Sequence, residues 1–137
     1  MLNVIRINNT LSAKWYRVLN LSAPNDGSAT FILSIHENSS VAGCQFLVMV
    51  SRYGGGAKVN LGLHYMNPTV TAGTTTAVTT QIKYRSAMQS TDVWVQLGGN
   101  GTAQSSISVL DKSGAAVNIG FIEETPASDA LDFNFAG

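Results

Sequence analysis

The hydrophobic pattern is a series of short alternating segments, two of which are apolar on both sides. Successive side chains of a strand point to opposite faces. In segment 43–53 (GCQFLVMVSRY), Leu47 and Met49 lie on the face opposite the other apolar residues. In segment 29–36 (ATFILSIH), Ile32 lies on the face opposite the other apolar residues. A small antiparallel sandwich usually buries one face and leaves the other in water. We therefore expect a second buried surface, most simply covered by a neighbouring subunit.

No segment has convincing helical periodicity, so alternation and turn residues predict strands throughout. In the turn at Pro24–Gly27, proline presets φ and glycine accepts a positive φ. The expected strands span 2–7, 14–21, 29–36, 45–53, 58–65, 81–86, 92–97, 106–110 and 117–122, with a short one at 131–135 and an edge strand or extended loop at 69–80.

This spacing of strands and turns predicts an all-β protein, an antiparallel β-sandwich that is jelly-roll-like. No repeat or linker divides the chain, so 1–137 is expected to be one domain. Within it, 1–13 is expected to be an N-terminal strand or arm and 123–137 a C-terminal arm.

Composition narrows the classes of function. The 137 residues carry 8 basic and 8 acidic side chains, a formal net charge of zero. A nucleic-acid partner is not expected, because it needs a basic face. Membrane insertion is not expected either, since no apolar run approaches the ~20 residues of a span. The start of the chain has no signal-peptide pattern, and Cys44, the single cysteine, predicts a small buried hydrophobe.

Catalytic chemistry finds little support. His36 and His64 are the only histidines, too few with one cysteine for an evident zinc site. Glu123 and Glu124 are better explained as a charged strand exit than as a glycosidase pair. The run 54–56 lacks the lysine and helix of a phosphate loop. We expect no enzyme, no cofactor and no metal.

Binding is the stronger signal. Trp94 alternates with Val93 and Val95, so its ring points away from the core and suits the apolar face of a pyranose. A Trp buried at a subunit contact is the alternative, and Trp15 is interpreted as a lid on the sandwich end. The candidate carbohydrate-binding residues are Trp94, Gln96, Arg85, His64, Asn60, Arg52 and Tyr53.

Three segments together resemble the C-terminal β-sandwich domains of bacteriophage tail fibres and tailspikes. They are KWYRVLNL with the downstream ATFILSIHE, FLVMVSRYGGG, and DVWVQLGGNGTAQSSISVL, and the resemblance covers about residues 14–122. The matching positions are Trp15, Val18, Ala29, Phe31, Leu33, Ser51, Arg52, Gly54, Val93, Trp94, Val95 and Leu97.

The resemblance implies a homotrimer at the tip of a virion fibre, joined to the rest of the fibre or tailspike. It implies trimerisation, binding of a host cell-surface glycan, or both, in a protein made in the host cytoplasm. The β-helix or shaft that precedes such domains is absent from this sequence, and lytic activity usually lies there, so catalysis is not carried over. A purely structural trimerisation module and a small polysaccharide hydrolase or esterase are the alternatives.

Overall fold

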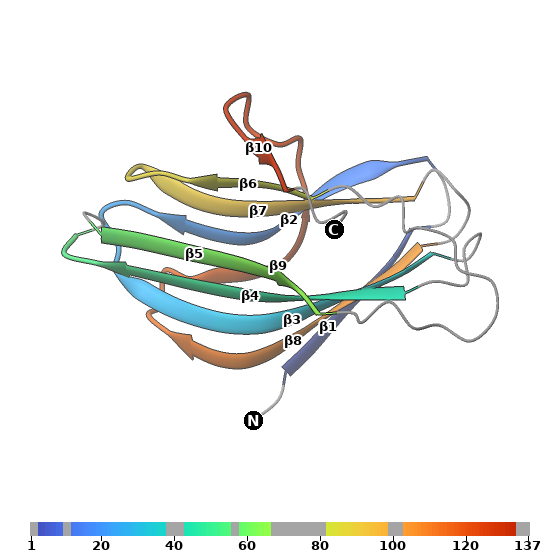
Figure 1. The fold of residues 1–137 in the computed structure, drawn as a ribbon, viewed down its shortest axis with the longest axis horizontal. Helices are drawn as coiled ribbons and strands as arrows, with labels where there is room; N and C mark the ends of the chain where they lie inside the picture. Colours follow the sequence, from blue (N-terminus) through green and yellow to red (C-terminus); the bar gives the residue numbers. More distant parts are fainter. Residues whose placement is uncertain are drawn as a thin grey trace.

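The computed structural model describes residues 3–9, 12–37, 43–55, 58–66, 82–98 and 103–133, and these form two antiparallel five-stranded sheets with no helix (Figure 1). The first sheet has the order β1-β8-β3-β4-β5 and the second the order β10-β6-β7-β2-β9. The strands are β1 Asn3–Asn9, β2 Lys14–Ser22, β3 Gly27–Glu37, β4 Gly43–Tyr53, β5 Lys58–Tyr65, β6 Ile82–Ser86, β7 Ser90–Leu97, β8 Ala103–Ser113, β9 Asn118–Glu123 and β10 Leu131–Asp132.

This arrangement confirms the predicted all-β antiparallel fold and fits a β-sandwich. Each predicted strand outside 69–80 has a counterpart, most of them longer than expected. Segment 69–80 lies outside the described residues, as does the side chain of Cys44. Among the described residues no helix exists that could cross a bilayer.

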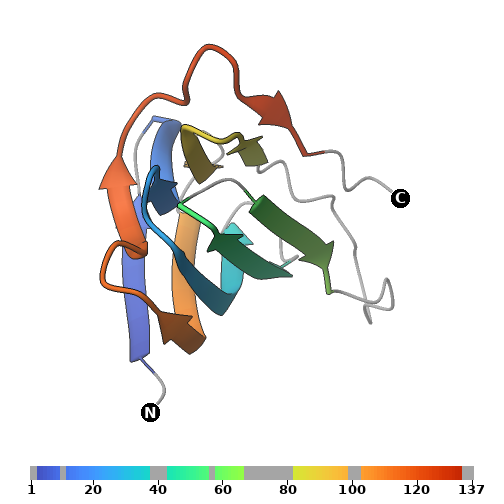
Figure 2. The same cartoon turned by 90° about the vertical axis from the view of Figure 1, so that its left-hand side faces the viewer.

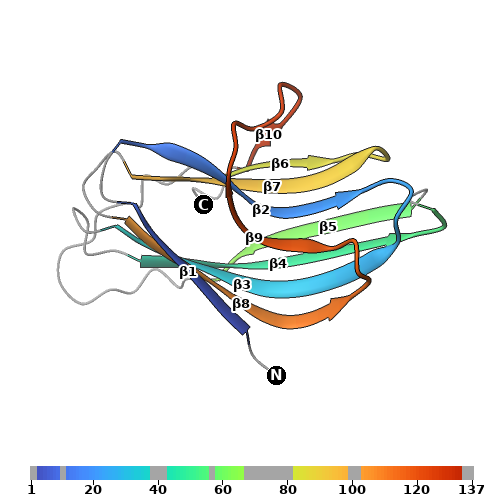
Figure 3. The ribbon, with the colours of Figure 1, turned by 180° about the vertical axis from the view of Figure 1, so that it is seen from behind.

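The hydrophobic core lies between the two sheets, which Figure 3 shows as two stacked layers. Alternation along each strand supplies it. Phe31 of β3 is opposite Val48 of β4, and Val93 and Val95 of β7 face them from the other layer. The fully buried apolar side chains include Leu19, Leu21, Phe31, Leu33, Ile35, Phe46, Val48, Val93, Val95, Leu97 and Ile107.

A bulge in β2 decides which of its residues face outward. The register of β2 against both β7 and β9 shifts between Arg17 and Leu19, so Val18 is the extra residue. Tyr16 and Val18 are buried before the shift and Leu19 after it. Trp15 and Arg17 therefore lie on the outer face of the second sheet.

The turn at Pro24–Gly27 differs from expectation at its glycine. Gly27 lies in β3 and is not among the glycines with positive φ. Close packing requires it instead, because a Cβ there would lie 2.6 Å from Cγ2 of Val117 and 2.8 Å from the carbonyl oxygen of Ser113. Positive φ occurs at Gly54 and Gly55, in the turn that joins β4 to β5.

The outer face of the first sheet carries the apolar residues expected to need cover. Ile32 of β3 is opposite Leu47 of β4, and both are half-buried. Met49 is 39% exposed and Val4, on β1 of the same face, 46% exposed. No described segment lies over this face in Figure 1. The predicted two-sided strands are thus present, with their second side open.

Candidate functional site

Trp94 lies on the outer face of the second sheet, as alternation predicts, but it is not exposed. Its side chain is 1% accessible. Its Nε1 donates a hydrogen bond to Oε2 of Glu124 at 2.9 Å, and the Arg85 guanidinium lies 5.7 Å from the ring centre. The expectation of an exposed ring is therefore wrong, and the cover belongs to the same chain.

The cover is the segment 124–133, which we call the C-terminal strap. Figure 2 shows it leaving β9 and passing over the second sheet to β10. Its first residue, Glu124, donates its backbone N–H to the carbonyl of Trp15 and accepts from Nη1 of Arg17 at 3.1 Å through Oε1. Its far end is held by β10 pairing with β6 and by Phe133, whose ring packs on Phe46 with centroids 6.0 Å apart.

A charged network lies beside Trp94. Asp92 is 1% exposed and accepts from Nη2 of Arg85 at 2.8 Å, from Nδ2 of Asn20 at 2.7 Å and from Oγ of Ser90 at 2.7 Å. Arg85 also pairs with Asp129 of the strap at 3.2 Å. Burial, the largest single influence, opposes the charge of Arg85, but the hydrogen bonds and charges of Asp92 and Asp129 raise its pKa above the ordinary value. Arg85 thus links the second sheet to the strap through its ion pairs with Asp92 and Asp129.

Arg52 occupies the interior rather than a binding loop. Its guanidinium is fully buried and donates to the backbone carbonyls of Leu21, at 2.5 Å, and Met88. These carbonyls belong to the second sheet and to the turn between β6 and β7, so Arg52 links the two layers. Arg52 was expected to contact a surface ligand, and this expectation is wrong, because its side chain points into the core. The next residue along the strand, Tyr53, points outward and is exposed.

The other candidates lie on different faces. His64 pairs with Leu47, and Asn60 with Ser51, on the outer face of the first sheet. Gln96, by contrast, is on the outer face of the second sheet. The seven predicted residues therefore do not form one site: they divide between two opposite faces and the interior.

A different tryptophan borders an open hollow. Trp15 is half-buried, and its register partner is Gln96. Nζ of Lys83 lies 5.9 Å from the Trp15 ring centre. We call the neighbouring space the Trp15 hollow; its volume is about 330 Å³, and its lining residues are Ala13, Lys14, Trp15, Glu123, Glu124 and Thr125.

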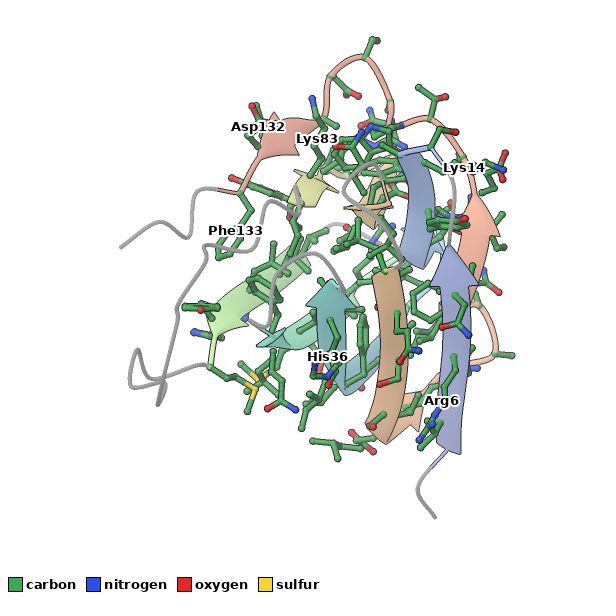
Figure 4. All side chains as sticks on the ribbon, turned by 90° about the vertical axis from the view of Figure 1, so that its right-hand side faces the viewer. Arg6, Lys14, His36, Lys83, Asp132 and Phe133 are labelled. Atoms are coloured by element: carbon green, nitrogen blue, oxygen red, sulfur yellow. The ribbon has the colours of Figure 1, made fainter. Side chains whose placement is uncertain are left out.

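The borders of the Trp15 hollow are charged and polar. Lys14 and Glu123 form an exposed ion pair at 3.3 Å, and Lys83 pairs with Asp132 at 3.4 Å. Figure 4 shows Lys14 and Lys83 on the same side of the molecule, opposite Arg6. A partly exposed indole beside carboxylate and ammonium groups can stack on a sugar ring while those groups bind its hydroxyls.

Trp15 was expected to be a lid on the sandwich end, and the surface it borders was not predicted from the sequence. A signal was available: Trp15 directly precedes Tyr16, which belongs to the core, so strand alternation directs the indole outward. The residues that border it from β9 and the strap are more than 100 positions away along the chain, which local pattern does not reveal.

Within the described parts of the chain, no three His, Cys, Asp or Glu side chains gather as a metal site would require. The acidic groups near Trp15 are occupied by ion pairs or hydrogen bonds instead.

Comparison with known proteins gives little further guidance. No family model matches the sequence, and no curated protein is significantly similar to it. A similar solved structure is Pantoea stewartii WceF, described as "a glycan biofilm modifying enzyme with a bacteriophage tailspike-like parallel beta-helix fold". The match covers 95% of this chain and 21% of that one, with 17% identity and a TM-score of 0.46. This chain therefore spans about a fifth of that protein, and a likeness this distant decides neither family nor activity.

Proposed function

We propose that this chain is a non-enzymatic carbohydrate-binding domain that recognises a cell-surface glycan through the Trp15 hollow. The observation that supports this most is the half-buried indole of Trp15 beside the hollow, with Gln96 as its register partner. A saccharide can cover the ring with its C–H face while Lys14 and Thr125 bind hydroxyls. The volume, about 330 Å³, falls at the lower end of the range for small-ligand sites.

We further propose that the domain belongs to a phage tail fibre or tailspike tip, as a jelly-roll-like sandwich assembled into a homotrimer in the virion. The tail-fibre resemblance of the sequence supports the setting. The apolar end of the outer face of the first sheet, where Ile32 is opposite Leu47 and Met49 is 39% exposed, supports the trimer, because association would remove this apolar surface from water. Three weak sites acting together would then give useful avidity.

A glycan array of bacterial surface oligosaccharides, followed by calorimetric titration of the best binder, tests the function. Trp15→Ala is expected to weaken binding roughly 5- to 150-fold, since losing an aromatic stacking contact costs about 1–3 kcal/mol. Tyr53→Ala is the matched control, because Tyr53 is an exposed aromatic residue, 58% accessible, at the β4–β5 turn. Equal binding by both variants and the wild type would remove the Trp15 hollow as the site.

A small hydrolase is a second candidate, favoured by the presence of both Glu123 and Glu124 at the Trp15 hollow. Their contacts argue for binding instead: Glu123 pairs with Lys14, while both oxygens of Glu124 are bonded, one to Arg17 and one to Trp94. Release of reducing ends from the array's best-binding glycan, lost in Glu123→Gln, would favour the hydrolase.

A purely structural trimerisation module is the third possibility. It predicts a trimer that binds no oligosaccharide on the array. A Trp94 substitution does not test this possibility, because Trp94 is covered by the strap of its own chain.

A further inference from the structure

A second hollow lies on the opposite side of the sandwich, on the outer face of the first sheet. Its volume is about 320 Å³. We call it the Arg6–His36 hollow. Its lining residues are Arg6, Ile7, Asn8, His36, Gln104, Ser105 and Ser106.

Strand register brings the polar members of this set together. Gln104 of β8 is the partner of both Asn8 of β1 and His36 of β3, and Ser106 is the partner of Arg6. Cross-strand partners share one face of a sheet. These five side chains therefore form two adjacent rows on three neighbouring strands.

Side-chain size explains the shape of the hollow. Ser106 on the central strand is short and half-buried, whereas Arg6, Asn8, His36 and Gln104 around it are longer and exposed. Strands lie about 4.8 Å apart, so the walls on β1 and β3 are about 10 Å apart. Gln104 stands between Asn8 and His36, so the open space lies over Ser106, and its volume of about 320 Å³ falls at the lower end of the range for small-ligand sites.

The charge of the lining selects the ligand. The hollow presents a guanidinium, an imidazole, two amides and a hydroxyl, and no carboxylate is among its lining residues. Among the described residues, the ion pairs engage Lys14, Arg17, Lys83 and Arg85, and none uses Arg6. The Arg6 guanidinium is thus available to a carboxylate from outside, which it can bind through two parallel hydrogen bonds.

We propose that the Arg6–His36 hollow binds an acidic sugar, with the uronate carboxylate on Arg6 and the ring hydroxyls on Asn8, His36 and Gln104. This rests on the proposed carbohydrate-binding function and adds a contact of different chemistry on the opposite face. The glycan is then an anionic polysaccharide. Ile7 is the one apolar residue among those lining the hollow, so the hollow offers hydrogen-bonding groups for sugar hydroxyls rather than an apolar pocket for a peptide side chain.

The test is a titration of the full chain with trigalacturonate, compared with the same trisaccharide after reduction of its carboxyl groups. Binding is followed by amide chemical shifts in 1H–15N spectra, which locate the contact. Arg6→Gln keeps a polar side chain without the charge and is expected to weaken trigalacturonate binding at least tenfold, since hydrogen bonds to charged groups exceed ~1.4 kcal/mol. Lys112→Gln, an exposed cation on the same strand as Gln104 but near its other end, is the matched control.

The inference is supported if trigalacturonate shifts the amides of 6–8, 104–106 and 36, Arg6→Gln removes these shifts, Lys112→Gln keeps them, and the reduced sugar binds at least tenfold more weakly. Equal binding of the reduced sugar, or of an acidic peptide of similar charge, would overturn it. Trp15→Ala separates the two proposals, because it should spare these shifts while weakening binding at the Trp15 hollow. If Trp15→Ala also removed the trigalacturonate shifts, the two hollows would not be separate sites, and the proposal for the Arg6–His36 hollow would be overturned.

Discussion

Trp94→Phe tests whether Trp94 is a structural residue beneath the C-terminal strap. The change removes the Nε1 donor that binds Oε2 of Glu124 at 2.9 Å. A hydrogen bond to a charged acceptor contributes about 1.5–3 kcal/mol, and the low end applies because the Glu124 side chain is 38% exposed and keeps Arg17. The smaller ring leaves a gap in a site that is 1% accessible, at a further cost of about 1 kcal/mol. We expect a loss of about 2.5 kcal/mol in the free energy of unfolding.

The expected loss translates into a measurable thermal shift. At about 2.1 cal/mol/K of unfolding entropy per residue, a chain of 137 residues loses about 9 °C in Tm for this change. Differential scanning calorimetry and urea unfolding followed by circular dichroism, at one fixed protein concentration, measure it. Trp15→Phe is the control and should cost under ~1 kcal/mol, because Trp15 is half-buried beside an open hollow. A Trp94→Phe variant within ~0.5 kcal/mol of the wild type, or no worse than Trp15→Phe, would refute the structural role.

Three further perturbations address the fold and the assembly. Gly27→Ala places a methyl group where no space exists and should lower the free energy of unfolding by about 2 kcal/mol. Gly120→Ala is the control and should be nearly neutral, because nothing lies within 4 Å of its added Cβ. Similar melting temperatures for the two variants would contradict the packing described. Asp92→Asn removes the buried partner of Arg85 and should cost about 3 kcal/mol in urea unfolding, with an unchanged midpoint as the opposing result. If the proposed trimer forms through the first sheet, Met49→Lys should reduce the mass from light scattering to one third, and a trimer that persists would exclude this face.

Most of the fold prediction rested on the alternation of apolar and polar residues along the strands. The faces assigned on β7 are confirmed, with Trp94 outward and Val93 and Val95 in the core. The β2 bulge was not predictable, because the consecutive apolar pair Val18 and Leu19 is compatible with several registers. Gly27 was expected to provide a positive φ, but glycine is needed there for close packing. The neighbours that crowd it come from the β8–β9 turn, which is remote in sequence.

The candidate site was predicted less well, for a physical reason. Whether an outward side chain is exposed depends on what crosses above it, and the strap is a polar segment without periodicity whose anchor, Glu124, is 30 residues from Trp94. The interior position of Arg52 did have a signal, because it continues the alternation of Val48 and Val50 into the core. From the sequence alone, a charged residue near the end of a strand is expected to be exposed. Arg52 is buried because its guanidinium binds two backbone carbonyls, those of Leu21 and Met88.

The indole N–H signals of the two tryptophans test the central claim most directly. The chain has two tryptophans, so a 1H–15N spectrum shows two such signals, assigned with the Trp15→Phe and Trp94→Phe variants. Titration with the best-binding surface oligosaccharide should move the Trp15 signal and leave the Trp94 signal, which reports the bond to Glu124, in place. Movement of the Trp94 signal alone, or of neither signal while calorimetry shows binding, would contradict a glycan site at the Trp15 hollow.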